Sequence, residues 1–242
     1  MKKEESLIFK GELQAQYQLG SDYLFGKIDG KVDYEKAVYW FTKSAEQGYA
    51  DAQCNLGYMY EYGKGVKQDY GEALILYRKS AEQGHSNAQN NLGNMYANGK
   101  GVTRDYAEAI KWYKKSIEQG NSIAQNTLGN MYENGKGVKQ DYIEAVKWYR
   151  KSAEQGYDKG QYSLGYMYRY GIGVKQDYSE ALKWYKKSAE QGYELAQYNL
   201  GDMYEKGQGV TQDKSEAVKW YKKSAEQGYE EAKKALEKMG EK

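Results

Sequence analysis

The sequence contains one histidine and one cysteine, the side chains that most often act as general base and nucleophile near neutral pH. A general base needs an oriented partner and a nucleophile within reach, and the residues around His85 supply neither. No charged or metal-binding neighbours are evident that would lower the pKa of Cys54. We therefore interpret His85 as a turn residue and expect no catalysis by Cys54.

Carboxylates that resemble paired acids also have a simpler interpretation. Glu82, Glu154 and Glu190 stand in the same short sequence, Ser-Ala-Glu-Gln-Gly, which recurs along the chain. Catalysis requires one singular constellation, whereas a residue present in every copy has a structural role in every copy. We expect no enzymatic activity and no catalytic residue; an enzyme with a small surface site would require turnover that is lost when His85 or Cys54 is changed.

Metal, disulfide and phosphate sites are equally unsupported. One cysteine excludes an intrachain disulfide, and one histidine beside it excludes the usual zinc ligand sets. The Gly-Lys-Gly-Val loops, such as residues 63–66, lack the spacing and the Lys-Ser/Thr pair of a phosphate-binding loop. Glycines there are better explained as helix ends. We expect no cofactor and no metal.

The charge balance argues against nucleic acid and membranes as partners. The chain has 36 basic and 34 acidic residues, for a formal net charge of +2. Lysine clusters such as Lys111, Lys114 and Lys115 are interpreted as a solvated outer helix face. The apolar run near the N-terminus, residues 7–9, is too short for a signal peptide or a membrane span. We expect a cytoplasmic protein as the sequence is written, or a periplasmic or secreted one if a leader has been removed.

A block of 36 residues recurs six times, and its second copy reads AQCNLGYMYEYGKGVKQDYGEALILYRKSAEQGHSN from Ala52 to Asn87. Repeats of this length predict stacked units that bury their apolar faces only against one another. The predicted organisation is an N-terminal capping segment (1–14), six repeats (15–51, 52–87, 88–123, 124–159, 160–195 and 196–231) and a C-terminal capping helix (232–242). Residues 6–10 are expected to form a short second helix that covers the first repeat.

Within a repeat the apolar spacing predicts two helices. Ala52, Leu56 and Met59 share one face of a first helix, which Gly63 ends. The second helix begins at an Asp-x-x-Glu capping box, which recurs as Asp69/Glu72, Asp105/Glu108, Asp141/Glu144, Asp177/Glu180 and Asp213/Glu216. Glycine recurs inside the first helix, where it costs roughly 1 kcal/mol relative to alanine. We expect these glycines to let the second helix approach closely; they are Gly20, Gly57, Gly93, Gly129, Gly165 and Gly201.

The repeat resembles that of the Sel-one-like repeat (SLR) family, relatives of tetratricopeptide arrays. The resemblance rests on A-x-x-x-L-G-x-x-Y-x-x-G-x-G-V and E-A-x-x-W-Y-x-K-S-A-E-Q-G, seen at residues 124–138 and 144–156, and it extends over about residues 12 to 240. It implies an all-α, right-handed superhelical α-solenoid, often bacterial, that acts as an adaptor, scaffold or regulator. The chain departs from the pattern in two ways: many members have proline after the Gly-Val of the loop, and one branch joins each repeat by a disulfide.

The face of each first helix opposite the apolar stripe carries the candidate site. In tetratricopeptide-like stacks this face lines the concave groove, and its residues differ between copies: tyrosine predominates in repeats two and five, and asparagine in repeats three and four. An asparagine amide both donates and accepts hydrogen bonds, and tyrosine gives rigid contact area. The candidate partner-binding residues are Tyr58, Tyr62, Asn90, Asn94, Asn98, Asn126, Asn130, Asn134, Tyr162, Tyr166, Tyr170 and Tyr198.

The predicted function is a non-enzymatic interaction module, an adaptor, scaffold or inhibitor of the immunity-protein kind. It is expected to bind an extended peptide or a protein loop in the groove, with the asparagines holding main chain and the tyrosines packing on side chains. A monomer is favoured. The alternative is binding of a glycan or cell-wall fragment, because a trough of tyrosine and asparagine also suits sugar rings and hydroxyls.

Overall fold

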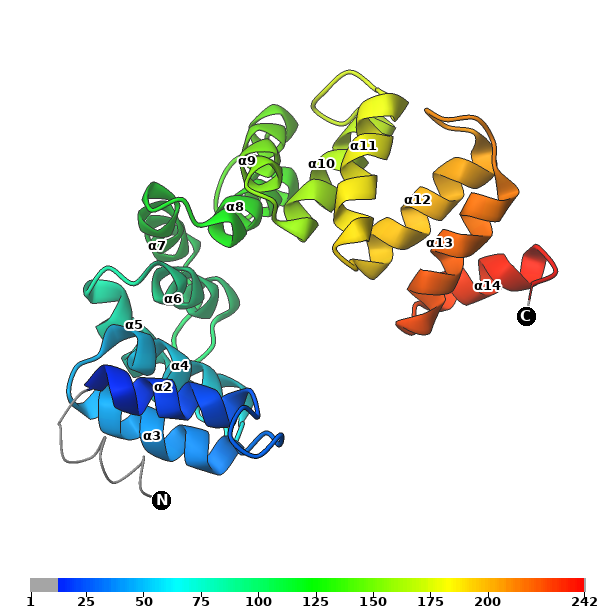
Figure 1. The fold of residues 1–242 in the computed structure, drawn as a ribbon. Helices are drawn as coiled ribbons and strands as arrows, with labels where there is room; N and C mark the ends of the chain where they lie inside the picture. The colour runs from blue at the N-terminus through cyan, green and yellow to red at the C-terminus, as the bar shows by residue number, and fades with distance from the viewer. Residues whose placement is uncertain (1–12, 242) are drawn as a thin grey trace. The chain divides into compact units, whose positions relative to one another are not determined.

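The protein is described by a computed structural model for residues 13–241, and every regular element in this range is an α-helix (Figure 1). The predicted all-helical fold of six helix-turn-helix repeats is confirmed. The first helices of the repeats are α2 (Leu13–Leu24), α4 (Ala50–Tyr62), α6 (Ser86–Asn98), α8 (Ser122–Asn134), α10 (Asp158–Tyr170) and α12 (Glu194–Lys206). The second helices are α3 (Tyr34–Glu46), α5 (Tyr70–Glu82), α7 (Tyr106–Glu118), α9 (Tyr142–Glu154), α11 (Tyr178–Glu190) and α13 (Lys214–Glu226).

The chain forms two units, Met1–Gly120 and Asn121–Lys242, each with three repeats. We call them unit 1 and unit 2. In both units the two helices of a repeat pack side by side, and each second helix also packs on the first helix of the next repeat in its unit. The expected N-terminal cap at residues 6–10 lies outside the described residues.

Aspartate begins each second helix as predicted, but only half of the capping box forms. The Asp69 carboxylate accepts hydrogen bonds from the backbone N–H groups of Gly71 and Glu72, at 2.8 and 3.1 Å. The expected bond from the Asp69 N–H to the Glu72 side chain is wrong, because this N–H donates instead to the carbonyl of Tyr60, at 3.0 Å. The same exchange occurs at the other four predicted boxes, so the cap also ties the second helix to the first.

The glycines inside the first helices allow the close approach that was predicted. A Cβ atom built on Gly57 would lie 2.9 Å from the ring of Tyr77 on α5, and one on Gly129 would lie 2.7 Å from the ring of Tyr149. Real Cβ atoms do not approach carbon this closely. The prediction is therefore confirmed: the missing side chain makes room for the ring of the second helix.

A repeated polar network joins each turn to the helices around it. The Ser80 hydroxyl donates to the carbonyl of Ala50 at 2.7 Å, and the Gln83 side-chain amide donates to the Oε1 of Gln53 at 2.7 Å. Gln53 in turn donates to the carbonyl of Ala45, in the preceding repeat. These bonds satisfy polar groups that the packing buries, which explains why the same serine and glutamine appear in every copy.

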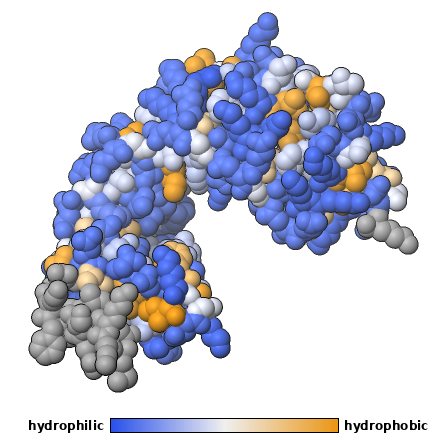
Figure 2. All heavy atoms as spheres, in the orientation of Figure 1, coloured by the Kyte–Doolittle hydropathy of each residue, from blue (hydrophilic) through white to orange (hydrophobic). Residues whose placement is uncertain are grey.

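Each unit has its own apolar core. In unit 1 it includes Tyr77, Leu92 and Met95, and in unit 2 it includes Tyr149 and Leu164; each of these side chains is less than 2% exposed. The visible surface of both units is mostly hydrophilic, with separate apolar patches (Figure 2). The mean hydropathy of the whole chain, −1.02, is therefore low although its core is apolar.

The last helix, α14 (Glu230–Lys238), packs on α13. Ala232 and Leu236 are buried against it, while Lys233, Lys234 and Glu237 are exposed. One side of the helix therefore covers the last repeat and the other faces solvent, as a cap requires. Within residues 13–241 no helix is long and apolar enough to cross a membrane.

Candidate interaction surface

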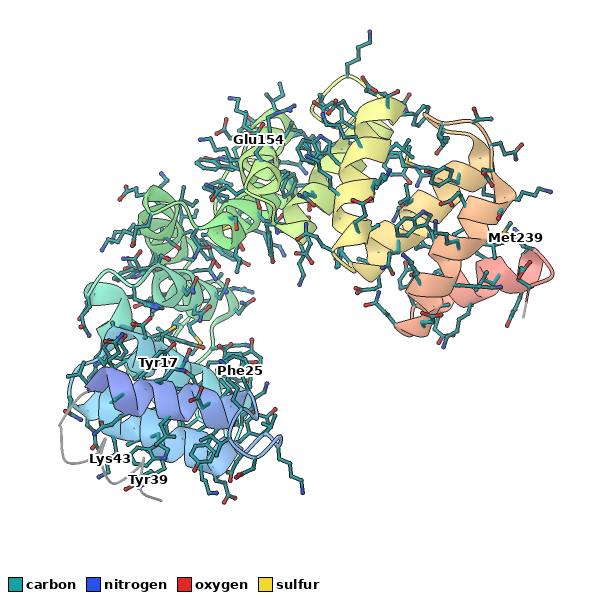
Figure 3. The ribbon with its side chains drawn as sticks, in the orientation of Figure 1. Tyr17, Phe25, Tyr39, Lys43, Glu154 and Met239 are labelled. Atoms are coloured by element: carbon teal, nitrogen blue, oxygen red, sulfur yellow. The ribbon has the colours of Figure 1, made fainter. Side chains whose placement is uncertain are left out.

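One stripe of each first helix is accessible to a partner. In α4 it consists of Asn55, Tyr58 and Tyr62, of which the first two are half-buried and Tyr62 is 53% exposed. These positions follow each other at three and four residues, so they share one side of the helix. We call the equivalent positions in all repeats the first-helix stripe. In repeat one the last position of the stripe is Phe25, which is 66% exposed at the end of α2 (Figure 3).

Part of the expected groove is buried. Cys54, Asn90 and Asn126 are only 5%, 4% and 8% exposed, so the expectation that this row of positions lines an open groove is wrong at all three. In α4, α6, α10 and α12 the first helix is flanked by its own second helix and by the second helix of the preceding repeat, so its buried arc is wider than the Ala/Leu stripe suggests. The invariant glutamine next to this row, Gln53 in repeat two, is buried too and marks the same side.

In unit 1 the tyrosines of repeat two form a pair. The rings of Tyr58 and Tyr62 have centroids 4.6 Å apart at 42°. The Lys64 ammonium donates to the Tyr58 hydroxyl at 3.0 Å, which raises the pKa of Lys64. The exposed Tyr62 ring has an apolar face with a fixed orientation. Two cations lie beside it: Lys64, and Lys100, whose ammonium is 5.7 Å from the ring centroid.

The asparagines of repeats three and four divide donor and acceptor roles. In unit 1 the Asn94 Oδ1 accepts from the Tyr113 hydroxyl at 2.7 Å, and the Asn98 Nδ2 donates to the Asn94 carbonyl at 2.8 Å. In unit 2 the Asn134 Nδ2 donates to the Asn130 carbonyl in the same way, while the single proton of the Tyr149 hydroxyl is shared between the Asn130 Oδ1, at 2.8 Å, and the Glu133 carboxylate. The side-chain N–H groups of Asn94 and Asn130 therefore remain available to a partner. The side-chain carbonyl oxygens of Asn98 and Asn134 remain available as well. A peptide group offers the complementary acceptor and donor.

The tyrosines of unit 2 form two kinds of contact. Tyr166 and Tyr170 make a pair with centroids 4.6 Å apart, and Tyr170 is 52% exposed. Tyr162 and Tyr198 are half-buried, because their rings pack against Tyr193 and Tyr229 at 5.2 Å in each case. Burial raises the pKa of Tyr162 to about 12, so its hydroxyl stays protonated at neutral pH. Tyr162 and Tyr198 are therefore only partly accessible to a partner, whereas about half of the Tyr170 side chain, 52%, is accessible.

A cavity of about 230 Å³ lies between α8 and α10 in unit 2. Asn130 and Glu133 of α8 line one side, and Tyr162, Ser163 and Tyr166 of α10 line the other. The Glu133 carboxylate accepts a hydrogen bond from the Tyr149 hydroxyl. Glu133 and Ser163 are functional candidates that the sequence analysis missed. The position of Ser163 on the stripe was the signal that could have identified it.

Repeat six offers less of this surface, because a buried charge network occupies it. The Arg169 guanidinium contacts the Asp202 carboxylate, the Oδ1 of Asn199 and the Oε1 of Gln208. Asp202, which holds the middle stripe position, is 9% exposed. Only Lys206 at the end of the stripe remains exposed. The accessible stripe of unit 2 is therefore concentrated in repeats four and five.

Comparison with known proteins places this geometry in a family. The sequence model of the Sel1 repeat matches residues 13–49, 50–85, 86–121, 122–157, 158–193 and 195–229. The chain belongs to the Sel1 repeat family. Curated proteins give no match.

Solved structures of Sel1 repeat proteins have the same fold. A Sel1 repeat protein from Oxalobacter formigenes is 35% identical, with a TM-score of 0.80 over 88% of this chain and 85% of that one. The protective antigen c5321 of uropathogenic Escherichia coli, described as displaying an SLR fold, is 44% identical with a TM-score of 0.74. The alignment covers 92% of this chain but only 48% of the antigen, so the chain spans about half the length of that protein. The immunity protein Pa5087 from Pseudomonas aeruginosa is 23% identical with a TM-score of 0.61, over 88% of this chain and 81% of that one.

The reactive groups of this Sel1 repeat protein have structural surroundings. The His85 Nδ1 accepts from the Ala88 N–H at 3.1 Å and so caps α6, while its Nε2 lies 3.2 Å from the Asp51 carboxylate. Burial raises the pKa of the Cys54 thiol to about 12, which suppresses the thiolate. Among residues 13–241, no three histidine, cysteine or acidic side chains gather as metal ligands would. The matching family is named for its repeat and not for an enzymatic activity.

Proposed function

We propose that this Sel1 repeat protein is an interaction scaffold that binds an extended peptide segment or a protein loop along the first-helix stripe. The asparagine pairs carry the proposal. Asn94 and Asn98 present uncommitted N–H groups and an uncommitted carbonyl oxygen on successive turns, which match the backbone C=O and N–H that an extended segment presents on one side. The equivalent pair in unit 2 does the same. The tyrosine pairs would pack on the side chains of the bound segment.

The family comparison supports a protein partner and not a particular one. An immunity protein shares the fold at 23% identity, so the likeness extends to the fold alone. Within the scaffold proposal the chain acts as an adaptor or as an inhibitor of the immunity-protein kind. Both roles require a surface that differs between repeats, since identical repeats would bind a segment in any register. The stripe has this property, because its middle and last positions are tyrosine in repeats two and five, asparagine in repeats three and four, and aspartate and lysine in repeat six.

The test uses peptides selected from a random display library against the whole chain. Asn98→Ala combined with Asn134→Ala removes the two exposed carbonyl oxygens without breaking a bond to a buried tyrosine. We expect at least about tenfold weaker binding of the selected peptides, equivalent to 1.4 kcal/mol. Thermal melting should be unchanged, because both side chains are exposed.

The matched control lies on the second helices. Lys111→Ala combined with Lys147→Ala removes two exposed side chains whose ion pairs with Glu108 and Glu144 lie on the outer face. Binding should be unaffected. Equal loss in both double variants, or no loss in the asparagine variant, would contradict the stripe as the binding surface. A melting shift with oligosaccharides, and none with the selected peptides, would assign the surface to glycans instead.

A further inference from the structure

The protein shows within itself how an ammonium group is bound beside a first helix. In unit 1 the Glu61 carboxylate accepts from the Tyr77 hydroxyl at 2.9 Å and from the Lys100 ammonium, also at 2.9 Å. Lys100 comes from the loop of the next repeat, and its ammonium lies 5.7 Å from the ring centroid of Tyr62 and 5.4 Å from that of Tyr70. A carboxylate and two tyrosine rings thus enclose the cation, a combination that favours it electrostatically.

The equivalent carboxylate in unit 2 has no such cation. Glu133 holds the place of Glu61 in repeat four, and the Tyr149 hydroxyl donates to it as Tyr77 does to Glu61. In the next repeat, however, Ile172 stands where Lys100 stands, and its side chain packs on the apolar core. Glu133 therefore forms no ion pair with any group in residues 13–241. Its half-buried carboxylate keeps one oxygen without a donor.

Two tyrosines line the same cavity as this carboxylate. Glu133 lines the cavity of about 230 Å³, with Tyr162 and Tyr166 opposite and Asn130 beside it. The volume is below the roughly 300–1,000 Å³ of pockets for drug-sized ligands and suits a single side chain. A half-buried carboxylate gains from a cation more than an exposed one does, because solvent screens it less.

We propose that this cavity binds the ammonium group of a lysine side chain from the partner protein. The ammonium donates to the free Glu133 oxygen, as Lys100 does to Glu61 in unit 1, and it packs on the rings of Tyr162 and Tyr166, which come from other positions of the repeat than Tyr62 and Tyr70. Lysine fits better than arginine, because the Tyr149 hydroxyl already occupies one carboxylate oxygen and a guanidinium fork prefers both. The inference rests on the proposed scaffold function and specifies one residue of the bound segment.

The first experiment measures the site without a partner. The whole chain, labelled with nitrogen-15, is titrated with N-acetyl-lysine-N-methylamide and observed by amide chemical shifts. We expect saturable shifts at residues 130–134 and 162–166. The probe N-acetyl-norleucine-N-methylamide, which keeps the four-carbon chain of lysine and lacks its ammonium group, should shift these residues at least about tenfold more weakly. Absent or unsaturable shifts with the lysine probe, or equal shifts with both probes, would overturn the proposal.

Two substitutions separate the carboxylate from the fold. Glu133→Gln keeps an acceptor for the Tyr149 hydroxyl and removes the charge, so lysine-probe binding should weaken about tenfold. Ile172→Lys supplies an internal ammonium where Lys100 stands in unit 1, so it should block the probe although Glu133 is intact. The control is Glu205→Gln: Glu205 accepts from the Tyr221 hydroxyl at 2.6 Å as Glu133 does from Tyr149, but it does not line the cavity. Full binding by Glu133→Gln, or an equal loss in Glu205→Gln, would contradict the assignment.

The display-selected peptides distinguish this inference from the scaffold proposal. We expect lysine at one fixed position of the peptides that bind unit 2, and about tenfold weaker binding when that lysine is replaced by norleucine. Peptides that need Asn98 and Asn134 but ignore both Glu133→Gln and Ile172→Lys would reject the lysine site and leave the scaffold function standing. Saturable lysine-probe binding without any stripe-dependent peptide would support the cavity and reject the scaffold role.

Discussion

Repeats two and five each have a buried tyrosine at the equivalent position, and the side chains next to these two tyrosines have opposite charges. In repeat two, Glu61 accepts from Tyr77 and is neutralised by Lys100 of repeat three. In repeat five the equivalent residue is Arg169, which turns toward Asp202 and Gln208 of repeat six. The buried Tyr185 hydroxyl then has no hydrogen-bond partner among residues 13–241. Both repeats have a tyrosine ring at this position because the ring packs on the glycine inside the first helix. The charge beside it can change sign provided that the next repeat changes with it.

This comparison shows which residues determine the order of the repeats in a duplicated chain. The packing residues are copied almost without change, so they determine that repeats stack but not which repeat follows which. The couplings Glu61 to Lys100 and Arg169 to Gln208 join residues 39 positions apart, across a repeat boundary. In an array whose stability is a sum of nearest-neighbour terms, such couplings fix the order of the repeats.

The largest effect is expected from Arg169→Ala. Removal of the guanidinium, which is 5% exposed, leaves the Asp202 carboxylate and the Gln208 carbonyl oxygen without their donors. Breaking a buried pair costs about 3–5 kcal/mol, and the lower end is expected here because the Lys206 ammonium still lies 2.7 Å from Asp202. Urea denaturation should show about 3 kcal/mol lower free energy of unfolding.

A double-mutant cycle checks the cause. If the cost comes from the unpaired carboxylate, Asp202→Ala in the Arg169→Ala background should restore part of the loss, with a coupling energy above about 1 kcal/mol. Strictly additive losses would mean that the guanidinium acts by packing alone, and the charge difference between repeats two and five would then be incidental.

Removal of one hydroxyl from Tyr77 and one from Tyr185 compares repeats two and five at a single atom. Tyr77→Phe removes the donor to Glu61, a carboxylate that is 8% exposed, and should cost about 2 kcal/mol. Tyr185→Phe removes a hydroxyl that has no partner and should change stability by less than about 0.5 kcal/mol or increase it. The two variants delete the same atom, so equal losses in urea denaturation would show that repeat five satisfies this hydroxyl after all.

The sequence predicted the elements of the fold more completely than the surface. Alanine, leucine and glycine at helical spacing indicated the helix pairs, and Gly57 indicated the close contact that Tyr77 makes. These are local signals repeated six times. The burial of Asn90 was missed because it depends on flanking helices that widen the buried arc. The network of Arg169 was missed because its partners lie in another repeat, and spacing within one repeat carries no information about them.

Glu61→Gln should have a smaller and pH-dependent effect. Glutamine still accepts from Tyr77 but no longer attracts Lys100, whose ammonium is about one third exposed; about 1.5 kcal/mol should be lost at pH 7. The hydrogen bond that the Lys100 ammonium donates to Glu61 raises the pKa of Lys100 above its usual range. A raised lysine pKa contributes stability that is complete below the unfolded value, about 10.4, and disappears as the pH rises through the folded value. The difference between wild type and Glu61→Gln should therefore narrow above about pH 10.4, and a constant difference would contradict the ion pair.

Opposing effects on stability are expected from Ile172→Lys, which copies the unit 1 ion pair into unit 2. The substitution loses apolar burial at Ile172 and gains a partly exposed ion pair with Glu133, two terms of about 1 kcal/mol or less and of opposite sign. Stability should therefore change by less than about 1 kcal/mol. The ion pair is revealed by the cycle with Glu133→Gln, where a coupling near 0.5 kcal/mol is expected. Zero coupling would mean that the loop of repeat five does not bring residue 172 to Glu133 as the loop of repeat three brings Lys100 to Glu61, and the parallel between the two carboxylates would fail.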